Sequence, residues 1–514
     1  MELRYFEFLK HLIRFNRQVY LDHNATTPVS DHVRRKMEQV LRNQYGNPSS
    51  FYGMGRKSAE LLEEARGHVA NAIHADLSEV YFTACATESN NAALKSVAAH
   101  FYPKKKKIVS TPIEHPSVLK TLDYLETQGV IVKYCRVDDK GRVQLAELEK
   151  MIDEDTFLVC CMLANNETGV IQDIKAVTKI AHHHGALVLT DCVQALGKIP
   201  IDLRAWDVDY ASFSAHKLYG PKGIGALYIK QGSPFTPLLH GGHQESGLRA
   251  GTESIHNIVG FGAACQEVDK LLAQSKRTQT LKRQLTQRLK EIKPDCVINS
   301  PESESLPNTL SVTFPGVENA GLMGMLDYRG IAVSAGSACS TGEDTPSHVL
   351  KAIGVSDQAA RETIRISLGH ETSSHDIRYT TQIIQDYIEG RISFVNMLAP
   401  AQLNENILFD EKTFILDVRP GDDRKKFDGL PNSHQVNPLR VENYLKQLPR
   451  DKNILVYCPG GGLSVMISYY LKSKGFKKIT NLRGGLDGWR KRRSDLYEKY
   501  AGQNVTILEP DKIN

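Results

Sequence analysis

Residues 212–228 read Ser-Phe-Ser-Ala-His-Lys-Leu-Tyr-Gly-Pro-Lys-Gly-Ile-Gly-Ala-Leu-Tyr. This run places Lys217 between a Ser/His pair and a turn rich in glycine and proline, which leads into an apolar strand. A lysine in such a setting can act as an amine nucleophile that forms a Schiff base with a carbonyl cofactor. Ser214 and His216 are polar residues able to hold a phosphate beside it. A lone lysine is more often an exposed surface residue, so the rest of the chain must decide between the two interpretations.

The segments around this run alternate between β-rich and helical patterns from about residue 66 to 230. Strands are expected at residues 80–83, 107–110, 157–163, 186–190 and 225–229. Between them, segments such as 88–99 and 174–184 carry apolar residues at helical spacing. The alternation predicts an α/β fold with a mainly parallel sheet covered on both faces. Ligands in such sheets bind at the carboxyl ends of the strands.

The pattern changes after residue 255 and again after residue 390, which indicates three domains. The second domain reads as α+β and begins with one long helix predicted over 259–292. The third restarts a short α/β pattern after a less periodic stretch that contains Pro400. The predicted boundaries give an N-terminal extension, a large domain, a small domain, a linker that begins the next domain, a second α/β domain and a tail: residues 1–18, 19–255, 256–390, 391–411, 412–500 and 501–514.

The composition excludes several classes of function. Hydrophobic residues make up 41% and charged residues 24% of the 514, as in ordinary soluble proteins. A net charge of +5 is too small to argue for direct nucleic-acid binding. No stretch approaches the roughly 18 apolar residues of a membrane helix, and the N-terminus lacks a secretory signal pattern. Nine cysteines without a C-x-x-C motif indicate reduced thiols, no structural metal and a cytoplasmic location.

Four short polar motifs follow apolar runs in the large domain: Ala86-Thr87-Glu88-Ser89-Asn90-Asn91, Glu114-His115-Pro116, Asn165-Asn166-Glu167-Thr168-Gly169 and Asp191-Cys-Val-Gln194. The first opens a helix, whose free N–H groups suit a phosphate. An aspartate at the carboxyl end of a strand can pair with a protonated ring nitrogen. Each motif alone also fits a helix cap, a turn or a structural histidine.

Taken with Lys217, these motifs closely resemble the pyridoxal-phosphate enzymes of fold type I, in the class V aminotransferase family. The opening Tyr20-Leu-Asp-His-Asn-Ala-Thr-Thr-Pro28 is similar to that family's first segment, and the resemblance covers residues 19–390. It implies a pyridoxal 5'-phosphate cofactor, a large domain with a mainly parallel sheet and a small α+β domain. Transamination, lyase chemistry and sulfur chemistry remain open at this point.

The segment Ser334-Ala-Gly-Ser-Ala-Cys339-Ser-Thr-Gly-Glu-Asp-Thr-Pro346 narrows the family. Its small and polar residues suit a loop, whereas Cys160 and Cys161 lie among apolar neighbours and are interpreted as packing residues. The segment resembles the active-site loop of group I cysteine desulfurases. The resemblance implies that L-cysteine becomes L-alanine while Cys339 carries the sulfur as a persulfide. The alternatives are a selenocysteine or cysteine-sulfinate lyase on the same scaffold, or a non-enzymatic scaffold of iron–sulfur assembly.

The resemblance also implies a role for each matching residue. Lys217 would hold the cofactor and move protons, and His115 would stack on its ring as acid and base. The implied cofactor contacts are Ala86, Thr87, Asn166, Asp191, Gln194, Ser214, His216, Lys217 and Thr252. Among them, Gln194 would contact the phenolic oxygen of the cofactor ring. Asn166 and Arg365 would clamp the substrate carboxylate, which suits a bidentate arginine. Thr252 would reach the phosphate of a partner subunit, which implies a homodimer, and His370 stands where the family often has another basic residue.

The last domain resembles a single-domain rhodanese in three segments: Ile415-Leu-Asp-Val-Arg419, Val456-Tyr-Cys458-Pro-Gly-Gly-Gly-Leu-Ser464 and Asn481-Leu-Arg-Gly-Gly-Leu-Asp-Gly-Trp489. A cysteine in a glycine-rich loop before a helix has backbone N–H groups aimed at its sulfur. The loop departs from the family by having Leu463 in place of an arginine and Pro459 in place of a polar or basic residue. Cys458 is therefore either a sulfur relay that takes the persulfide from Cys339, or a vestigial residue in a domain that serves for docking or regulation. The implied acceptor is an iron–sulfur scaffold or a tRNA-thiolation enzyme.

Overall fold

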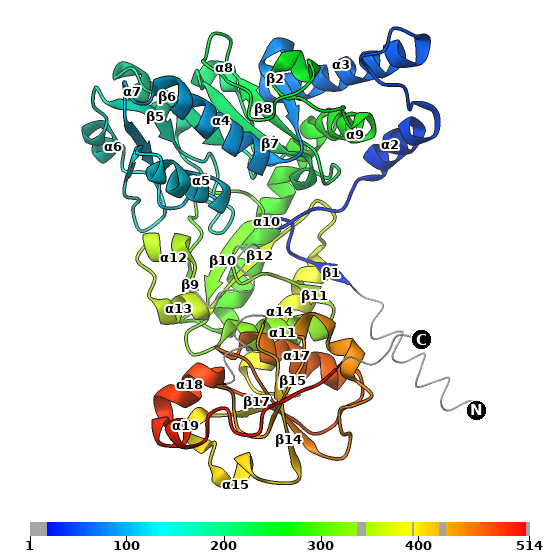
Figure 1. Cartoon of the computed structure of the whole chain (residues 1–514), viewed down its shortest axis with the longest axis vertical. Coiled ribbons are helices and arrows are strands. Elements are labelled where there is room, and N and C mark those ends of the chain that lie inside the picture. The colour runs from blue at the N-terminus through cyan, green and yellow to red at the C-terminus, as the bar shows by residue number, and fades with distance from the viewer. Residues whose placement is uncertain (1–17, 337–345, 393–394, 421–427, 510–514) are drawn as a thin grey trace.

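The computed structural model describes residues 18–336, 346–392, 395–420 and 428–509. Three domains follow one another along the long axis of the molecule, and α10 (Val268–Ile292) leads from the first into the second (Figure 1). Nearly all of the expected N-terminal extension lies outside the described residues, and so does Cys339. Within the described ranges, no helix is both long and apolar enough to cross a membrane.

The large domain is built on a mainly parallel sheet, which confirms the predicted fold class. Its strands lie in the order β2 (Val80–Thr83), β8 (Gly225–Ile229), β7 (Tyr210–Ser214), β6 (Leu187–Asp191), β5 (Thr156–Cys160), β3 (Lys107–Ser110) and β4 (Ile131–Tyr134). β8 runs antiparallel to β2 and β7, and the other neighbouring pairs are parallel. β5, β7 and β8 are buried at every residue, as expected for strands covered on both faces.

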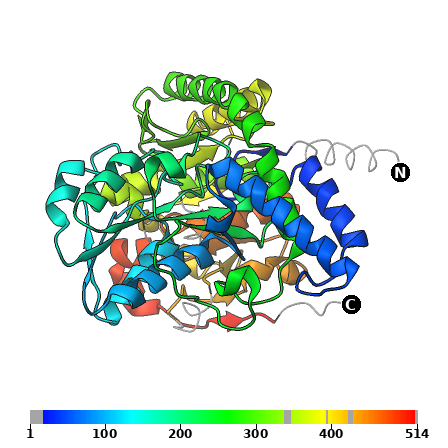
Figure 2. The same ribbon diagram turned by 90° about the horizontal axis from the view of Figure 1, so that it is seen from above.

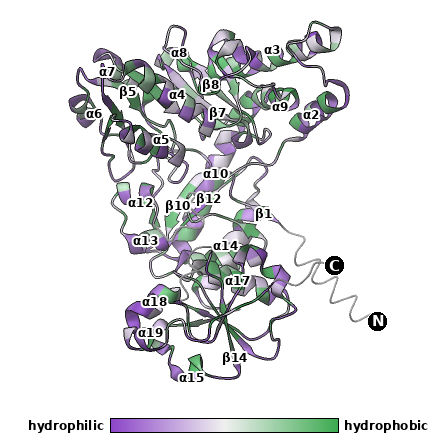
Figure 3. Cartoon of the chain, viewed as in Figure 1, coloured by the Kyte–Doolittle hydropathy of each residue, from purple (hydrophilic) through white to green (hydrophobic). Residues whose placement is uncertain are grey.

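Helices cover both faces of this sheet, as the view from above shows (Figure 2). α4 (Ala86–Phe101) and α5 (Pro116–Thr127) close one apolar cluster against the strands. On the opposite face a second cluster is closed by α3 (Gly53–Ile73), α7 (Ile174–His183) and α9 (Ile255–Gln266). The remaining helices of this domain are α2 (Asp31–Asn43), α6 (Leu145–Met151) and α8 (Leu203–Trp206). Hydrophobic residues gather along interior strands such as β5, and hydrophilic residues cover peripheral helices (Figure 3).

The prediction of one helix over 259–292 is wrong, because the structure breaks it at Glu267 into α9 and α10. Glu267 has φ −90° and ψ 0°, and its carboxylate accepts a hydrogen bond from the Ser30 hydroxyl at 2.7 Å. No glycine or proline marks the break in the sequence. The break lets α9 stay on the large domain while α10 leads toward the small one (Figure 1).

The small domain has a sheet in which β10 (Thr309–Thr313) pairs antiparallel with β12 (Thr363–Ser367) and β9 (Val297–Ile298). β1 (Val19–Tyr20) pairs in parallel with β11 (Ile331–Ala332), so the start of the described chain belongs to this domain. The helices after α10 are α11 (Asn319–Tyr328), α12 (His348–Ala352), α13 (Asp357–Arg361) and α14 (Ser374–Ile388). The opening segment therefore passes from the small domain to the large one.

The C-terminal domain is a parallel sheet with helices on both sides. Its strands lie in the order β13 (Asn396–Leu398), β17 (Ile479–Leu482), β16 (Asn453–Tyr457), β14 (Thr413–Asp417), β15 (Ser433–Gln435) and β18 (Thr506–Ile507). Its helices are α15 (Glu405–Leu408), α17 (Gly462–Ser473), α18 (Gly485–Arg492) and α19 (Ser494–Tyr500). The sheet therefore takes β13 from the segment expected as a linker and β18 from the segment expected as a tail.

The small and C-terminal domains share one apolar cluster, because α17 packs against α11. The ring of Tyr469 lies over Gly324, where an added Cβ would be only 2.7 Å from the ring. Near the start of α17, a Cβ added to Gly462 would lie 3.5 Å from Ala320 of α11. The loop that carries Cys458 is thus placed beside the first turn of α11.

Candidate active site

The predicted site residues of the large domain gather where its parallel strands end. Lys217 and His216 lie in η2 (Ala215–Lys217) directly after β7, and Asp191 is the last residue of β6. His115 caps α5 after β3, and Ala86 begins α4 after β2. The carboxyl ends of neighbouring parallel strands meet at one edge of a sheet, which is why segments far apart in the sequence meet here.

The opening segment wraps around Lys217. The Lys217 ammonium donates to the backbone oxygens of Asn24, at 2.5 Å, and Ala25, at 2.7 Å. The backbone oxygen of His216 accepts hydrogen bonds from the N–H and the hydroxyl of Thr27. Residues 20–28 therefore hold η2, the turn that carries Lys217 (the lysine turn), in place. Asn24 contacts Lys217 directly, and the sequence reasoning missed it.

Asp191 is buried and linked to His115 through a chain of hydrogen bonds. Its carboxylate accepts from the Asn90 amide and the Val193 N–H, both at 3.0 Å. The same Asn90 amide donates to the Ser117 hydroxyl, which lies 2.8 Å from His115 Nδ1. The sequence analysis gave neither Asn90 nor Ser117 a role in the site. The signal that could have found them is a polar residue within the first two turns of a helix that follows a strand.

The state of the His115 imidazole follows from its contacts. Its Nδ1 accepts the Ser117 N–H at 3.1 Å, so a neutral ring carries its proton on Nε2. Burial lowers the pKa of His115; the Lys217 charge adds to this effect and Asp191 opposes it. A neutral ring at pH 7 can both accept and return a proton, which an acid–base residue requires.

The first turn of α4 is open to an anion. Its N-cap residue, Cys85, makes no side-chain capping bond, and the side chain of Thr87 is exposed. Gly225 at the start of β8 comes so close that an added Cβ would lie 2.8 Å from the Cys85 carbonyl carbon. Ser214 ends the adjacent β7. These groups offer backbone N–H donors and hydroxyls at a helix N-terminus, which suits a phosphate.

His216 is the remaining member of the predicted phosphate site. Its Nδ1 lies 3.1 Å from the Thr26 hydroxyl, which ties it to the opening segment. Burial and the charges of Lys217 and Lys222 lower the pKa of His216 to about 4. The ring is therefore neutral at pH 7 and can contribute a hydrogen bond rather than a positive charge.

Arg365 is almost fully buried and held by two partners. Its guanidinium donates to Asp22 at 2.7 Å and to the backbone oxygen of Asn166 at 2.9 Å. Its Nε has no hydrogen-bond partner among the described residues. The structure thus places Asn166 and Arg365 in contact, and it adds Asp22, a partner of Arg365 that the sequence reasoning missed.

Two further residues singled out in the sequence, Thr252 and His370, lie at the edge of this site or beyond it. Thr252 is exposed on a loop that the pair Arg249–Glu88, at 2.9 Å, ties to the first turn of α4. His370 is not a second cation at pH 7, because burial lowers its pKa. Ser347, just after the point where the described chain resumes at residue 346, donates its hydroxyl to Glu167 at 2.6 Å.

Cys458 has its own site in the C-terminal domain. Its sulfur accepts the N–H groups of Gly461, at 3.2 Å, and Ser464, at 3.3 Å, and lies 3.4 Å from the Ser464 hydroxyl. The start of α18 supports the loop, because Leu486 N–H donates to the Cys458 carbonyl. Burial nevertheless raises the pKa of the Cys458 thiol, and the hydrogen bonds only partly oppose this shift.

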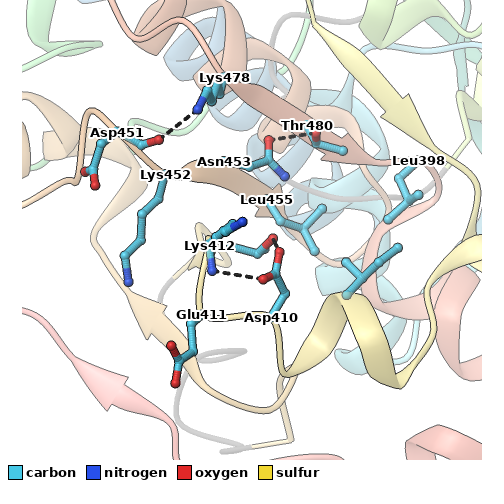
Figure 4. A pocket seen from close by; sticks show the side chains of 12 residues that line it. Leu398, Asp410, Glu411, Lys412, Asp451, Lys452, Asn453, Leu455, Lys478 and Thr480 are labelled. Carbon is cyan, nitrogen blue, oxygen red and sulfur yellow. Dashed lines mark hydrogen bonds between the residues drawn. The ribbon is translucent and has the colours of Figure 1, made fainter.

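A pocket of about 460 Å³ in the same domain is separate from this site (Figure 4). It is lined by residues at the amino ends of β14, β16 and β17, including Thr413, Asn453 and Thr480. Cys458 lies beyond the carboxyl end of β16, at the opposite edge of the sheet. The pocket therefore has no part in chemistry at Cys458.

Comparison with known proteins agrees with this fold. The aminotransferase class V family matches residues 19–379, and the rhodanese-like domain matches residues 399–492. The chain therefore belongs to the class V aminotransferase family and carries a C-terminal rhodanese-like domain. Within that family it is a member of the cysteine desulfurases, as its relatives show.

Two curated relatives and two solved structures illustrate this. The chain is 41% identical over 377 residues to the cysteine desulfurase IscS of Dictyoglomus turgidum, covering 73% of this chain and 95% of that protein. It is 40% identical over 372 residues to a cysteine desulfurase of Nostoc sp., covering 72% and 93%. A NifS-like protein superimposes with a TM-score of 0.69 at 44% identity, over 73% of this chain and 100% of that one. SspA in complex with cysteine gives 0.62 at 35% identity, over 68% and 98%.

Enzymes of this family depend on pyridoxal 5'-phosphate, and the strand-end residues fit that group. Lys217 offers an amine for its aldehyde, and Asp191 offers a buried carboxylate for its ring nitrogen. The uncapped turn of α4 beside Gly225 offers a cradle for its phosphate. The donors and acceptors of the site therefore match the chemical groups of the cofactor.

Proposed function

We propose that this chain converts L-cysteine to L-alanine and retains the sulfur as a persulfide on Cys339. The observation that carries the proposal is the connection between Lys217 and Arg365. Asn24 accepts from Lys217 through its backbone oxygen and donates from its side chain to the Asn166 carbonyl, which Arg365 also contacts. An amine for a cofactor and a cation for a carboxylate thus converge on one site, as an amino-acid substrate requires.

The residues of the chain then have distinct tasks. The cofactor, when bound, supplies an electron sink that acidifies the Cα proton of the substrate. Arg365 holds the carboxylate, Lys217 moves the Cα proton, and Asp191 keeps the ring nitrogen protonated. The substrate C–S bond breaks as the Cys339 thiolate forms an S–S bond with its sulfur. Cysteine and the Cys339 thiol thus become alanine and a persulfide, and the one proton that the Cys339 thiol loses balances the one that the alanine methyl group gains.

The proposal extends to a relay in which Cys458 takes the sulfur from Cys339. Two observations support it: N–H groups already surround the Cys458 sulfur, and α17 packs on α11. α11 leads through β11 to the segment that carries Cys339, so both cysteines are attached to one packed unit. The final acceptor would be an iron–sulfur scaffold protein or a tRNA-thiolation enzyme. A docking role for this domain is the alternative.

A homodimer forms part of the same proposal. Thr252 is exposed in the single chain, and the loop between α2 and α3 exposes large aromatic side chains, with Phe51 93% and Tyr45 82% accessible. Exposed apolar groups of this size are typical of interfaces. Light scattering should give a mass near twice 57.3 kDa, and a monomer would count against the proposal.

Persulfide mapping tests the desulfurase and relay proposals together. The holoenzyme is given L-cysteine, blocked by alkylation and digested, and the sulfur on each cysteine is located by mass spectrometry. We expect sulfur on Cys339 and Cys458 in the unmodified chain, on neither in Cys339→Ser, and on Cys339 alone in Cys458→Ser. The buried Cys265 provides an internal control that should stay unlabelled.

The outcomes separate the alternatives. Sulfur on Cys339 alone in the unmodified chain would make the C-terminal domain a docking module. Alanine formation at the normal rate in Cys339→Ser would contradict the role of Cys339 itself.

The Cys458 loop has Leu463 where rhodaneses usually have an arginine, and this difference leads to a second prediction. Leu463→Arg should lower the pKa of Cys458 by about one unit, because a nearby positive charge favours the thiolate. The raised pKa of the original thiol means that its alkylation rate should climb only at alkaline pH. In the variant this climb should occur at lower pH, and sulfur transfer from thiosulfate to cyanide should increase about tenfold. Leu463→Met, which keeps an apolar side chain, is the control, and an equal change in both variants would refute the explanation.

A further inference from the structure

A second lysine, Lys198, lies beside the site and was not assigned a role. Its Nζ donates to Gln194 Oε1 at 2.7 Å and to Asn24 Oδ1 at 3.2 Å. It lines a small cavity of about 40 Å³ together with Lys217, His23 and His370. Lys198 therefore reaches the same interior space as Lys217 while contacting one of the predicted cofactor residues.

The contacts of Gln194 determine how its amide is oriented. A protonated lysine has only donors, so the atom facing it is the Gln194 oxygen. The opposite amide group donates from Nε2 to the backbone oxygen of Asn24 at 3.0 Å, and that oxygen can only accept. With the amide reversed, its nitrogen would face the Lys198 ammonium, which is a donor. Its oxygen would face the Asn24 backbone oxygen, which is an acceptor. The orientation leaves the second N–H of Gln194 available to an acceptor in the site.

Lys198 also fixes the orientation of Asn24. The Asn24 Oδ1 accepts from Lys198 and from the Asn308 amide, the latter at 3.0 Å. The Asn24 Nδ2 donates to the Thr309 hydroxyl at 2.8 Å and to the Asn166 carbonyl. Asn24 is thereby held by contacts on every polar atom, and its backbone oxygen serves both Gln194 and Lys217.

Holding a lysine here is energetically unfavourable in itself. Burial and the positive charges of Lys217 and Arg365 lower the pKa of Lys198 well below its usual range. His23 and His370 face the same cavity, and burial lowers the pKa of both, so they do not add positive charge at pH 7. A neutral Lys198 amine keeps N–H donors and also gains a lone pair, but the Asn24 backbone oxygen can still only accept from Gln194 Nε2, so the orientation of Gln194 persists in either state.

We propose that Lys198 is a positioning residue, which orients the Gln194 amide so that an N–H faces the phenolic oxygen of the bound cofactor. The inference rests on the proposed function, because Gln194 contacts that oxygen only if Lys217 carries the cofactor. A donor at this oxygen stabilises its anionic form. Lys198 thus tunes the Lys217-linked chromophore through Gln194 without touching it.

The test measures the absorption spectrum of the holoenzyme as a function of pH. We compare the original chain with Lys198→Met, Gln194→Leu and the double variant. Loss of the oriented donor should raise the apparent pKa of the chromophore by about one unit, the size expected for one hydrogen bond to a charged group. Since Lys198 acts through Gln194, the double variant should shift no further than Gln194→Leu alone.

Lys282→Met is the matched control. Lys282 is partly buried, as Lys198 is, and burial lowers its pKa to about 8; it donates to Ser305 and to the Leu306 carbonyl, away from Gln194. Its replacement should lower thermal stability and leave the chromophore pKa unchanged. If Lys198→Met fails to fold, Gln194→Glu keeps an acceptor for Lys198 but removes both N–H donors. That variant should also raise the chromophore pKa.

An unchanged chromophore pKa in Lys198→Met, or in Gln194→Glu where the first variant does not fold, overturns the inference. Equal and additive shifts from Lys198 and Gln194 overturn it as well, because they indicate a direct charge effect. Failure of the proposed function gives a different result. In that case the original chain itself would form no Lys217-dependent chromophore and no alanine from cysteine.

Discussion

Lys217→Ala is expected to reduce alanine formation from L-cysteine by at least about 10³-fold, within the range attributed to proton-transfer groups. The Lys217 amine donates to the backbone oxygens of both Asn24 and Ala25. Removing it takes away the attachment point of the cofactor and the base for the Cα proton. Steady-state alanine release and the visible absorption spectrum measure the two losses separately.

Lys222→Ala is the control for this change. Lys222 is exposed in the same glycine-rich turn, so this variant should form alanine at the original rate. Lys217→Arg retains the charge and the donors without an amine of matching reactivity. It should retain the fold and remain inactive. Turnover above about a tenth of the original rate in Lys217→Ala would contradict the central role given to this residue, because a loss of tenfold corresponds to only about 1.4 kcal/mol.

Asp191→Asn is expected to lower kcat by about 10²- to 10³-fold with a small change in KM, as for loss of one preorganised electrostatic group. A neutral amide cannot hold a proton on the cofactor ring nitrogen as a carboxylate does. The two oxygens of Asp191 accept from Asn90 and Val193, so an amide nitrogen placed at either position faces another donor. We therefore also expect a stability loss of about 1–2 kcal/mol, measured by thermal unfolding.

Asp209→Asn is the matched control for this second effect. Asp209 is another buried carboxylate of the same sheet, and it accepts from the Val188 N–H and from His182, both at 2.8 Å. It precedes β7 and so lies at the opposite edge from Lys217. The Asp209→Asn variant should lose stability, while its cofactor spectrum and kcat stay the same as in the original chain. A similar kcat loss in both variants would show that destabilisation, not ring chemistry, explains Asp191.

The strand pattern could be predicted because it is local. Apolar runs at 80–83, 107–110 and 225–229 became β2, β3 and β8 with the same bounds. The break of the long helix at Glu267 was missed, because its partner Ser30 lies 237 residues earlier and no glycine or proline marks the position. The spacing of residues near Glu267 does not reveal a contact with a residue so far away in the sequence.

The sequence by itself determined that His115 and Asp191 follow strands of a mainly parallel sheet. It did not predict β7, the strand that ends just before Lys217, so the structure was needed to place Lys217 at the same edge. Strands and helices differ in the spacing of their apolar residues, and this spacing can be read from short windows of sequence. Only the tertiary structure decided the positions of Asn24, Asp22 and Lys198. Lys217 meets Asn24 across 193 residues, and Arg365 meets Asp22 across 343. Such contacts depend on the path of the whole chain, because buried donors and acceptors must find partners wherever folding brings them.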